Sequence, residues 1–535
     1  MKLFVFLGFI VFLGFSCSSP PDFNQNTIDA ALENGKQANE GYIRSLDFTK
    51  AWLTKTDSVT GLIPTNLNSS VDFWEPHNSA ADNYAFMVLT AYLLDKKLYN
   101  GPLLDMLNTE KKLTSRINSL PDVWSFSKQD FRFSEIDTGR IIFGASEYIK
   151  DGLIPLNEYI GESPWQERML EMLNDLLPLL DDPDKLINYF ERMASVEEVN
   201  GEMLQTLSRI YWMTGDEKYL DLATRIGDYY LLGERNLSEI EYLRIRDHGC
   251  EIIGGLSELY VTLHVVNPAK KEAYKIPFYA VLDRILEIGR NEDGLFYNAV
   301  NAKTGEIIDE KIVDNWGYVF NAYYSVWLVD KKEEYRDAVL KGFTKLNSNY
   351  RNYRWEGDSH DGYADALESG INLYNREPEP DLKSWIDSEM QVMFGMQQDD
   401  GIIGGWHGDG NFARTAIMYS LWKTQGAHVF PWREDVIIGA EKSGDETYFV
   451  ITAENDWQGK LVFDSPRHQT ILNLPIDYPR INQFPEWFTA VEGEMYTLQS
   501  PEKEIAGVHD ATQLQNGVPV ELVAGDTLVF SVRMN

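Results

Sequence analysis

The stretch Trp355–Arg376, W-E-G-D-S-H-D-G-Y-A-D-A-L-E-S-G-I-N-L-Y-N-R, is a short loop followed by a helical pattern. Apolar residues recur there at the spacing of one helix face, which predicts a helix from about Asp361 that packs against a core. Beside them runs a lysine-free polar stripe of Asp361, Asp365, Glu368 and Asn372. This stripe is either a solvated acidic face with an N-capping aspartate or a face turned toward a ligand, with His360 and Tyr363 at its start.

Amphipathic helices follow one another from about residue 40 to about residue 430, joined by short loops rich in Gly, Pro and Asp. Ser163 and Asp216 are predicted to cap two of them. No fixed repeat length is visible, which argues against a solenoid and favours a closed (α/α) toroid of paired helices. The clearest expected helices are 80–94, 163–177, 202–213, 218–232, 251–265, 276–289, 317–329, 332–346, 382–397 and 412–424.

The composition changes after Pro431, where short β-branched and aromatic runs are bounded by Gly, Asp, Asn and Pro. This pattern predicts an antiparallel β-sandwich. The expected strands are 436–438, 448–452, 460–463, 470–474 and 528–532. The predicted organisation is therefore a signal peptide (1–16), an (α/α)-toroid catalytic domain (17–433) and a β-sandwich domain (434–535).

The N-terminus has the pattern of a bacterial lipoprotein signal. Lys2 precedes the apolar run Leu3–Phe15, which is too short to span a bilayer comfortably, and Ser16 and Cys17 follow. We expect Cys17 to be lipidated, so that the protein touches a membrane only through this anchor on the cell envelope. An ordinary secretory peptide with a chance cysteine is the alternative. Cys250 is the only other cysteine, and no disulfide is then expected.

The charge balance narrows the function. The chain has 535 residues, with 83 Asp and Glu against 48 Lys and Arg, a net charge of −35. Nucleic-acid binding is disfavoured because it needs a basic surface. The 14 Trp and 28 Tyr suit a protein that stacks aromatic rings on sugars. No Cys and His spacing is typical of a zinc site, and neither a metal nor a cofactor is predicted, although a Ca²⁺ ion on Asp-rich loops such as Gln398–Asp400 stays open as an alternative.

Five loop-to-helix junctions combine aromatic, histidine and charged residues. In a toroid such junctions can meet at one end and line its mouth. Four of the eight histidines lie in them, which favours a shared site over isolated capping or core roles. The junctions contain Trp74, His77, Asp82 and Tyr84; Arg246, His248 and Glu251; Asp314, Trp316 and Tyr318; the opening stretch; and Trp406, His407, Asp409 and Arg414.

The lipoprotein-like start, the paired helices and the H-G-D-G-N-F-A-R-T stretch before a β-rich tail resemble bacterial (α/α)-toroid enzymes that process uronic-acid polysaccharides. These enzymes include polysaccharide lyases, unsaturated uronyl hydrolases and the ulvan oligosaccharide dehydratase of marine Bacteroidetes. The resemblance implies a toroid fold and an anionic oligosaccharide substrate. It concerns architecture and assigns no catalytic position.

The His, Tyr and Arg content of the junctions favours β-elimination, and the resemblance implies that it acts on a uronic acid at the non-reducing end of an anionic, ulvan-type oligosaccharide. This reaction needs a base, an acid and a group that neutralises the carboxylate. It leaves an unsaturated uronyl end, and the enzyme is a dehydratase or a lyase. The predicted catalytic residues are His248, His407, His360, Tyr318, Tyr363 and Glu368. The predicted substrate-binding residues are Trp74, His77, Tyr84, Arg246, Trp316, Trp406 and Arg414, with the arginines on a carboxylate or sulfate and the tryptophans on sugar rings.

Two alternatives stay open. Hydrolysis by an exo-acting glucuronidase or unsaturated uronyl hydrolase needs carboxylates, which the chain also offers. A non-catalytic surface glycan-binding lipoprotein needs only aromatic and hydrogen-bonding groups. Convergence of the five junctions in one deep pocket would favour an enzyme, whereas aromatics along a flat groove would favour binding. The carboxylates in question are Asp82, Glu251, Asp314, Asp365 and Glu368.

Overall fold

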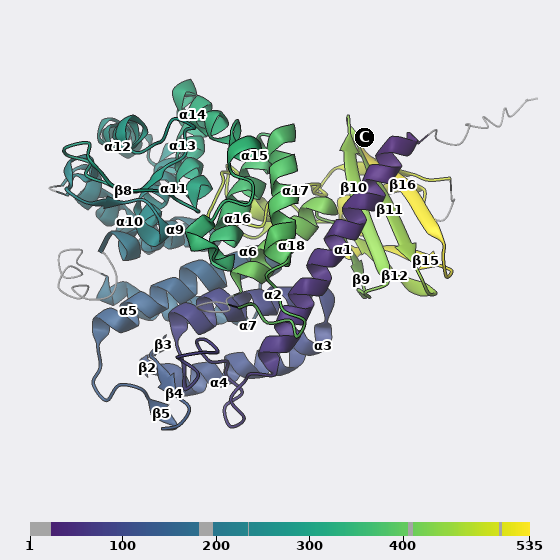
Figure 1. The fold of residues 1–535 in the computed structure, drawn as a ribbon, viewed down its shortest axis with the longest axis horizontal. Helices are drawn as coiled ribbons and strands as arrows, with labels where there is room; N and C mark the ends of the chain where they lie inside the picture. The colour runs from purple at the N-terminus through teal and green to yellow at the C-terminus, as the bar shows by residue number, and fades with distance from the viewer. Residues whose placement is uncertain (1–22, 181–195, 234, 405–409, 502–504) are drawn as a thin grey trace, which may run out of the picture.

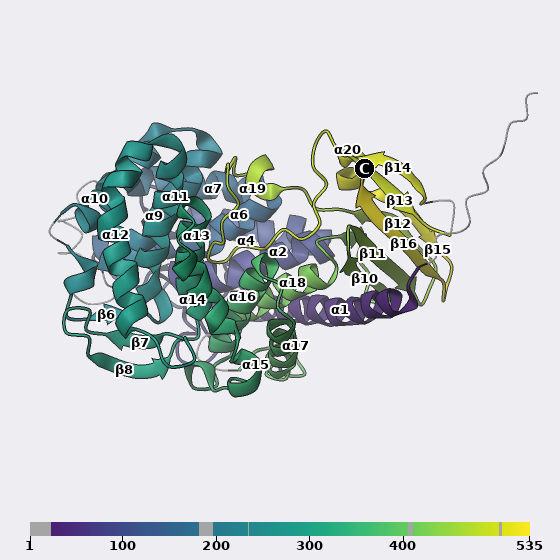
Figure 2. The ribbon, with the colours of Figure 1, turned by 90° about the horizontal axis from the view of Figure 1, so that it is seen from above.

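The computed structural model describes residues 23–180, 196–233, 235–404, 410–501 and 505–535. Helices form one large body, and the strands of the C-terminal part lie at the opposite end of the molecule (Figures 1 and 2). Small sheets within the helical body were not predicted, because each strand is only two to six residues long. They are built from β1 (Phe73–Trp74), β2 (Ser115–Ile117), β3 (Leu120–Pro121), β4 (Trp124–Ser125), β5 (Asp130–Phe131), β6 (Leu243–Arg244), β7 (Tyr297–Val300) and β8 (Ile307–Ile312).

The inner helices of the body form a closed ring, as a toroid requires. Each contacts the next, and α18 returns to α2, so the ring closes on itself. In ring order these elements are α2 (Ala85–Leu94), the continuous run α5 (Thr138–Glu147), η3 (Tyr148–Leu153) and α6 (Ile154–Ile160), then α9 (Val196–Thr214), α11 (Glu251–Val266), α13 (Trp316–Asp330), α16 (His360–Arg376) and α18 (Asn411–Lys423).

Outer helices cover the ring, and all of them except the first, α4 (Leu104–Thr114), pack on the inner helix that precedes them in sequence. Each pair buries apolar faces that neither helix could bury alone, which is why the amphipathic pattern predicted pairs. The outer helices are α4 (Leu104–Thr114), α7 (Pro164–Leu176), α10 (Glu217–Leu231), α12 (Pro268–Ile288), α14 (Glu333–Phe343) and α17 (Pro380–Phe394). Short helical turns complete the body: η1 (Pro76–Tyr84), α3 (Lys96–Leu98), η2 (Tyr99–Leu103), η4 (Leu177–Leu179), η5 (Leu237–Glu239), η6 (Asp247–Cys250), α15 (Leu346–Asn349) and η7 (Trp355–Gly357).

Helix α1 (Gln25–Leu53) joins the two ends of the molecule. It packs on α18 at the ring and on β10 of the sheets (Figure 1). Gly35 allows the close approach to β10, because a Cβ there would lie 2.9 Å from the backbone nitrogen of Gly439. Among the described residues, no helix is both long and apolar enough to cross a bilayer.

The C-terminal part contains two antiparallel sheets whose apolar side chains form one hydrophobic cluster. One sheet has the order β10-β11-β16-β13-β14 and the other β15-β12-β9. The strands and turns are β9 (His428–Phe430), β10 (Val436–Ser443), β11 (Glu446–Ala453), β12 (Trp457–Val462), α19 (Arg467–Thr470), β13 (Met495–Gln499), β14 (Gly507–Asp510), α20 (Ala511–Asn516), β15 (Val518–Leu522) and β16 (Thr527–Met534).

Two expectations for these elements were wrong. Residues 470–474 do not form a strand. They follow directly on the helical turn α19, which ends at Thr470 and lies away from the two sheets, packed on α6 (Figure 2). Helix α12 begins at Pro268 instead of residue 276. Pro277 lies inside this helix, which continues on both sides of it. The predicted caps Ser163 and Asp216 are confirmed by their side-chain bonds to Gln166 N and Lys218 N.

Candidate active site

One cavity of about 580 Å³ lies where several inner helices begin. Its volume is in the range of small-ligand sites. All five junctions contribute to its lining. The junction residues that line it are Asn78 and Asp82; Asp247, His248 and Glu251; Asn315 and Tyr318; Glu356, Asp358, Ser359, His360, Asp361 and Asp365; and Gly404, Asn411 and Arg414.

Ser359 sets the position of the acidic stripe on α16. Its hydroxyl accepts hydrogen bonds from the backbone nitrogens of Asp361 and Gly362, at 3.1 and 3.4 Å. The N-cap is therefore this serine and not Asp361, and the helix starts one residue earlier than expected. Asp361 and Asp365, one turn apart, line the cavity, whereas Glu368 is 0% exposed in the wall behind.

Tyr318, Asp365, Glu368 and Arg414 form one bonded group in this wall. The Tyr318 hydroxyl lies 2.9 Å from Asp365 Oδ1 and 2.8 Å from Glu368 Oε2. The Arg414 guanidinium contacts the same two carboxylates, at 2.8 and 2.9 Å. It also donates hydrogen bonds to the side-chain amide oxygens of Asn411 and Asn482, both at 2.8 Å. Its positive charge is therefore already matched by protein carboxylates.

Glu368 holds a proton more readily than an ordinary glutamate. Burial raises its pKa from 4.5 to about 7, with the nearby charge of Asp365 acting in the same direction and the Arg414 guanidinium against it. The backbone nitrogen of Asn482 donates to Glu368 Oε1 at 2.6 Å. Glu368 can therefore exchange a proton near neutral pH.

A second buried group is centred on Lys150 of η3. Its ammonium lies 2.7 Å from Asp151 Oδ1 and 2.5 Å from Glu251 Oε1. Asn482 also donates to Asp151 Oδ1, at 2.8 Å. Burial alone would raise the pKa of Asp151, but the Lys150 ammonium lowers it to about 2. Asp151 thus stays ionised, while burial raises the pKa of Glu251.

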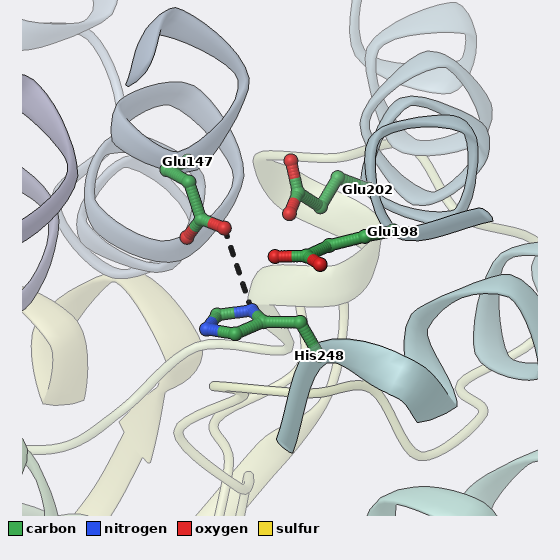
Figure 3. Close-up of side chains that lie close together, drawn as sticks. All are labelled: Glu147, Glu198, Glu202 and His248. Atoms are coloured by element: carbon green, nitrogen blue, oxygen red, sulfur yellow. Dashed lines mark ion pairs between the residues drawn. The ribbon is translucent and has the colours of Figure 1, made fainter. Parts of the chain in front are cut away.

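Three further carboxyl groups meet His248 at the edge of the cavity. Glu147 ends α5, Glu198 and Glu202 lie one turn apart on α9, and His248 belongs to η6; their side chains point toward one another (Figure 3). The Nδ1 atom of His248 lies 3.4 Å from Glu147 Oε1. Burial opposes protonation of His248, but the charges of Glu198, Asp151 and Glu202 outweigh it and raise its pKa.

A second pocket of about 530 Å³ adjoins the cavity and shares Asp247 and Glu356 with it. It contains the cationic side chains of Arg246, Lys311 and Arg354. Arg246 is well exposed, and its nearest carboxylate among the described residues, Asp247, is 3.9 Å away. Arg354 pairs with Asp358 at 2.6 Å, and Asp247, Asp309, Asp314 and Glu356 also line this pocket, so Arg246 and Lys311 are its candidate cations for an anionic ligand.

Only some of the residues predicted as catalytic lie at the cavity among the described residues. His248, His360 and Tyr318 line the cavity, and Glu368 lies directly behind Tyr318. Tyr363 is buried in the core on another face of α16, at 2% exposure. His407 lies outside the described residues, as do Trp406 and Cys17.

The predicted sugar-binding aromatics are mostly in the core. Trp74, Trp316 and Tyr84 are 1%, 0% and 2% exposed, so protein atoms cover the ring faces that were expected to stack on sugars. The Tyr84 hydroxyl donates to a backbone carbonyl and accepts from Trp165 Nε1, at 2.7 and 2.8 Å. His77 is half-buried beside Glu75, at 3.6 Å, and does not line the cavity.

Several site residues were missed by the sequence reasoning. Lys150 and Asp151 form a charged pair inside the apolar run Y-I-K-D-G-L, a signal that could have been noticed. Asn482 reaches the cavity from the segment that returns from the sheets, which no local pattern indicates. Glu198 and Glu202 have helical spacing, but nothing in the sequence distinguishes them from a solvated face.

No family model and no curated protein matches the chain. Solved structures do. The GH76A alpha-1,6-mannanase from Salegentibacter sp. HEL1_6 is 12% identical, with a TM-score of 0.39 over 71% of this chain and 98% of that one. An unsaturated glucuronyl hydrolase specific for heparin is 11% identical, with a TM-score of 0.39 over 74% and 96%. A glycosyl hydrolase family 88 protein from Bacteroides vulgatus is 14% identical, with a TM-score of 0.35 over 52% and 89%.

These names belong to carbohydrate-active enzymes that process polysaccharides, the group that the sequence resembles. Identities and TM-scores of this size transfer neither the substrate nor the reaction to this chain. Both have to be argued from its own residues.

Proposed function

We propose that the chain is an exo-acting carbohydrate-active enzyme that hydrolyses the terminal glycosidic bond of an oligosaccharide. The observation that supports hydrolysis most is the charge of the cavity. Carboxyl groups dominate its lining, while its Lys and Arg side chains, Lys150 and Arg414, are both engaged by protein carboxylates. The acidic lining residues are Asp82, Asp151, Asp247, Glu251, Glu356, Asp358, Asp361 and Asp365.

This charge distribution opposes a uronate carboxylate deep in the cavity. Two like charges about 5 Å apart repel by about 3 kcal/mol at an effective dielectric constant of about 20. β-Elimination at a uronate needs the opposite, a cation or several donors on the carboxylate. Hydrolysis needs carboxyl groups, one to protonate the leaving oxygen and one to activate water or attack the sugar. We therefore favour hydrolysis over the elimination that the sequence suggested.

Asp365 is the proposed acid. It faces the cavity, and Tyr318 joins it to the buried carboxyl of Glu368 through bonds of 2.9 and 2.8 Å. We propose that Asp365 and Glu368 share one proton, so that the other carboxyl of the pair keeps the negative charge that balances Arg414. The buried carboxyl of Glu368, whose pKa is about 7, holds this proton, and the Tyr318 hydroxyl accepts it from Glu368 while donating its own to Asp365, which protonates the glycosidic oxygen.

Asp151 is the proposed partner carboxylate. It lines the same cavity, and Lys150 keeps it ionised. An ionised carboxylate can accept a proton from water or attack the sugar carbon, whereas Asp365 needs a proton supply. The pKa of Asp151 is lowered to about 2 and that of Glu368, the proposed proton store behind Asp365, is raised to about 7. Carboxyl groups whose environments separate their pKa values are the pattern expected of an acid and a base.

The anionic part of the substrate is proposed to lie in the second pocket. Arg246 and Lys311 are there, next to the residues that the two pockets share. The terminal ring would occupy the main cavity, and a sulfate or carboxylate of the next residue would meet the cations. This arrangement keeps the anionic oligosaccharide expected from the sequence and offers its charge Arg246 and Lys311, which share this pocket with Asp247, Asp309, Asp314 and Glu356.

The test is kinetic. Asp365→Asn should lower kcat for release of a terminal sugar by about a hundredfold or more, the usual scale for losing an acid–base group. The control is Asp381→Asn, an exposed aspartate on α17. Tyr318→Phe keeps the ring and removes the relay hydroxyl, so it should slow turnover even if the Asp365 variant misfolds. Full activity in folded forms of both variants would exclude this mechanism.

β-Elimination remains the second candidate, and a specific observation favours it. His248, His360 and Tyr318 line one cavity, which brings several proton-transfer groups together. This reaction would produce an unsaturated uronyl end with ultraviolet absorbance, which hydrolysis of a saturated sugar does not. Binding of oligosaccharides without any product would instead favour a glycan-binding lipoprotein.

Attachment to the cell envelope through Cys17 is also proposed, on the sequence pattern alone. Wild-type protein produced in a bacterial host should appear in the membrane fraction. Cys17→Ser should appear in the soluble fraction. Equal distribution of the two proteins would contradict lipidation.

A further inference from the structure

The cluster of Glu147, Glu198, Glu202 and His248 is a compact set of metal-ligand atoms. One carboxylate oxygen from each glutamate and one ring nitrogen of the histidine all lie within 4.8 Å of one another. The four residues come from α5, α9 and η6, and their polar ends face a common centre (Figure 3). No local pattern in the sequence requires this convergence.

The polar atoms of the cluster point to a missing ligand. Glu202 is 0% exposed, and among the described residues its carboxylate oxygens meet no donor other than the carboxyl of Glu147, with which Glu202 can share a proton. Glu147 Oε1 and His248 Nδ1 also lack hydrogen bonds there. A buried carboxylate without a donor costs several kcal/mol unless a cation or a proton satisfies it.

The cations around the cluster do not satisfy it. Lys150, the nearest buried ammonium group, is held between Asp151 and Glu251. Arg244 lies 3.5 Å from Glu198 only, and it also pairs with Asp247. In the part of the chain that the structure describes, the guanidinium of Arg244, shared with Asp247, lies at the edge of these three carboxyl groups, and Glu198 has a further interaction within the protein. Either protons held between them or a bound cation must offset the remaining charge.

We propose that Glu147, Glu198, Glu202 and His248 bind one divalent first-row transition metal ion, Zn²⁺ or Mn²⁺. The donor set argues for this class, because imidazole suits transition metals whereas Ca²⁺ and Mg²⁺ prefer oxygen ligands alone. Ligand atoms about 2.0–2.2 Å from such an ion lie about 3.3–3.6 Å apart in a tetrahedral site, so ion binding requires the ligand atoms of the cluster to approach one another by up to about 1.5 Å. His248 would bind through Nδ1, the atom that faces Glu147.

The ion would join three separate elements and fix His248 at the edge of the cavity. It lies behind the cavity wall, since His248 lines the cavity and the three glutamates do not. The proposed hydrolysis uses Asp365 and Asp151, which are not metal ligands. A negative result for metal binding would therefore leave the proposed hydrolysis unaffected, and the reverse also holds. Its role would be to position the wall and to neutralise the glutamates.

The test is isothermal titration calorimetry on full-length protein freed of metal with EDTA and dialysed. Zn²⁺, Mn²⁺ and Ca²⁺ are titrated separately. We expect one site per chain for Zn²⁺ or Mn²⁺, with affinity at least tenfold weaker in Glu202→Gln and in His248→Ala. Glu197→Gln is the matched control: it lies on the same helix, pairs with Arg235 and is outside the cluster.

Each outcome decides the proposal. Weakening in both variants and not in the control supports it. His248 is half-exposed, so its variant keeps the test open if the buried Glu202 variant does not fold. Absence of Zn²⁺ and Mn²⁺ binding, binding of Ca²⁺ alone, or binding unchanged by His248→Ala would overturn it. If the cluster holds protons and binds no metal, addition of Zn²⁺ or Mn²⁺ would leave the melting temperature of the wild-type protein unchanged, which would also overturn the proposal.

Discussion

Replacement of Glu368 by Gln should change how stability depends on pH. The folded protein raises the pKa of Glu368 from 4.5 to about 7 because the carboxyl is buried. A group whose pKa is raised by folding contributes stability that is present below pH 4.5 and lost as pH rises through 7. At 1.36 kcal/mol for each pH unit, the loss amounts to about 3 kcal/mol. Glutamine has nearly the same shape as glutamic acid but does not titrate, so this decrease in the free energy of unfolding is absent from the variant.

The assay is urea unfolding of both proteins at several pH values from 5 to 8. The free energy of unfolding of Glu368→Gln, relative to wild type, should rise by about 3 kcal/mol across this range. Subtracting the free energy of unfolding of wild type from that of the variant at each pH cancels the contributions of titrating groups that do not contact residue 368. Glu334→Gln, an exposed control on α14, should show no such trend. A constant difference between Glu368→Gln and wild type would refute the raised pKa and with it the proposed proton supply.

Further predictions concern the other charged groups. Lys150→Met leaves the buried carboxylates of Asp151 and Glu251 without their cation, and urea unfolding should show a loss of about 3–5 kcal/mol. Arg246→Ala should raise KM for an anionic oligosaccharide about tenfold, equivalent to about 1.4 kcal/mol, and leave kcat unchanged in steady-state kinetics. Ser359→Ala removes the cap of α16 and should cost about 1 kcal/mol in the same unfolding assay.

Much of the fold could be predicted from the sequence because its signals are local. Helical spacing and capping residues located most paired helices, as Ser163 and Asp216 show. Failures came where a distant contact decides the structure. Residues 470–474 have the composition of a strand, yet their segment packs on the helical body, and Pro277 is accommodated within a long helix.

The site was predictable only in part. The five junctions share a recognisable composition, and the structure brings residues of all five to one cavity. Exposure was not predictable, because a tryptophan such as Trp316 at a junction can equally well fill the core. The charge state was not predictable either. Arg414 looked available for a substrate, but its carboxylate partners come from α16, about fifty residues away in sequence.

The most direct test of the central claim is the origin of the oxygen in the product. The protein is incubated with ulvan-derived oligosaccharides in water enriched in the heavy oxygen isotope, and the products are analysed by mass spectrometry. Hydrolysis predicts a released terminal sugar that contains one heavy oxygen, with no new ultraviolet absorbance. A product that contains no heavy oxygen and absorbs as an unsaturated uronate would contradict hydrolysis and establish β-elimination.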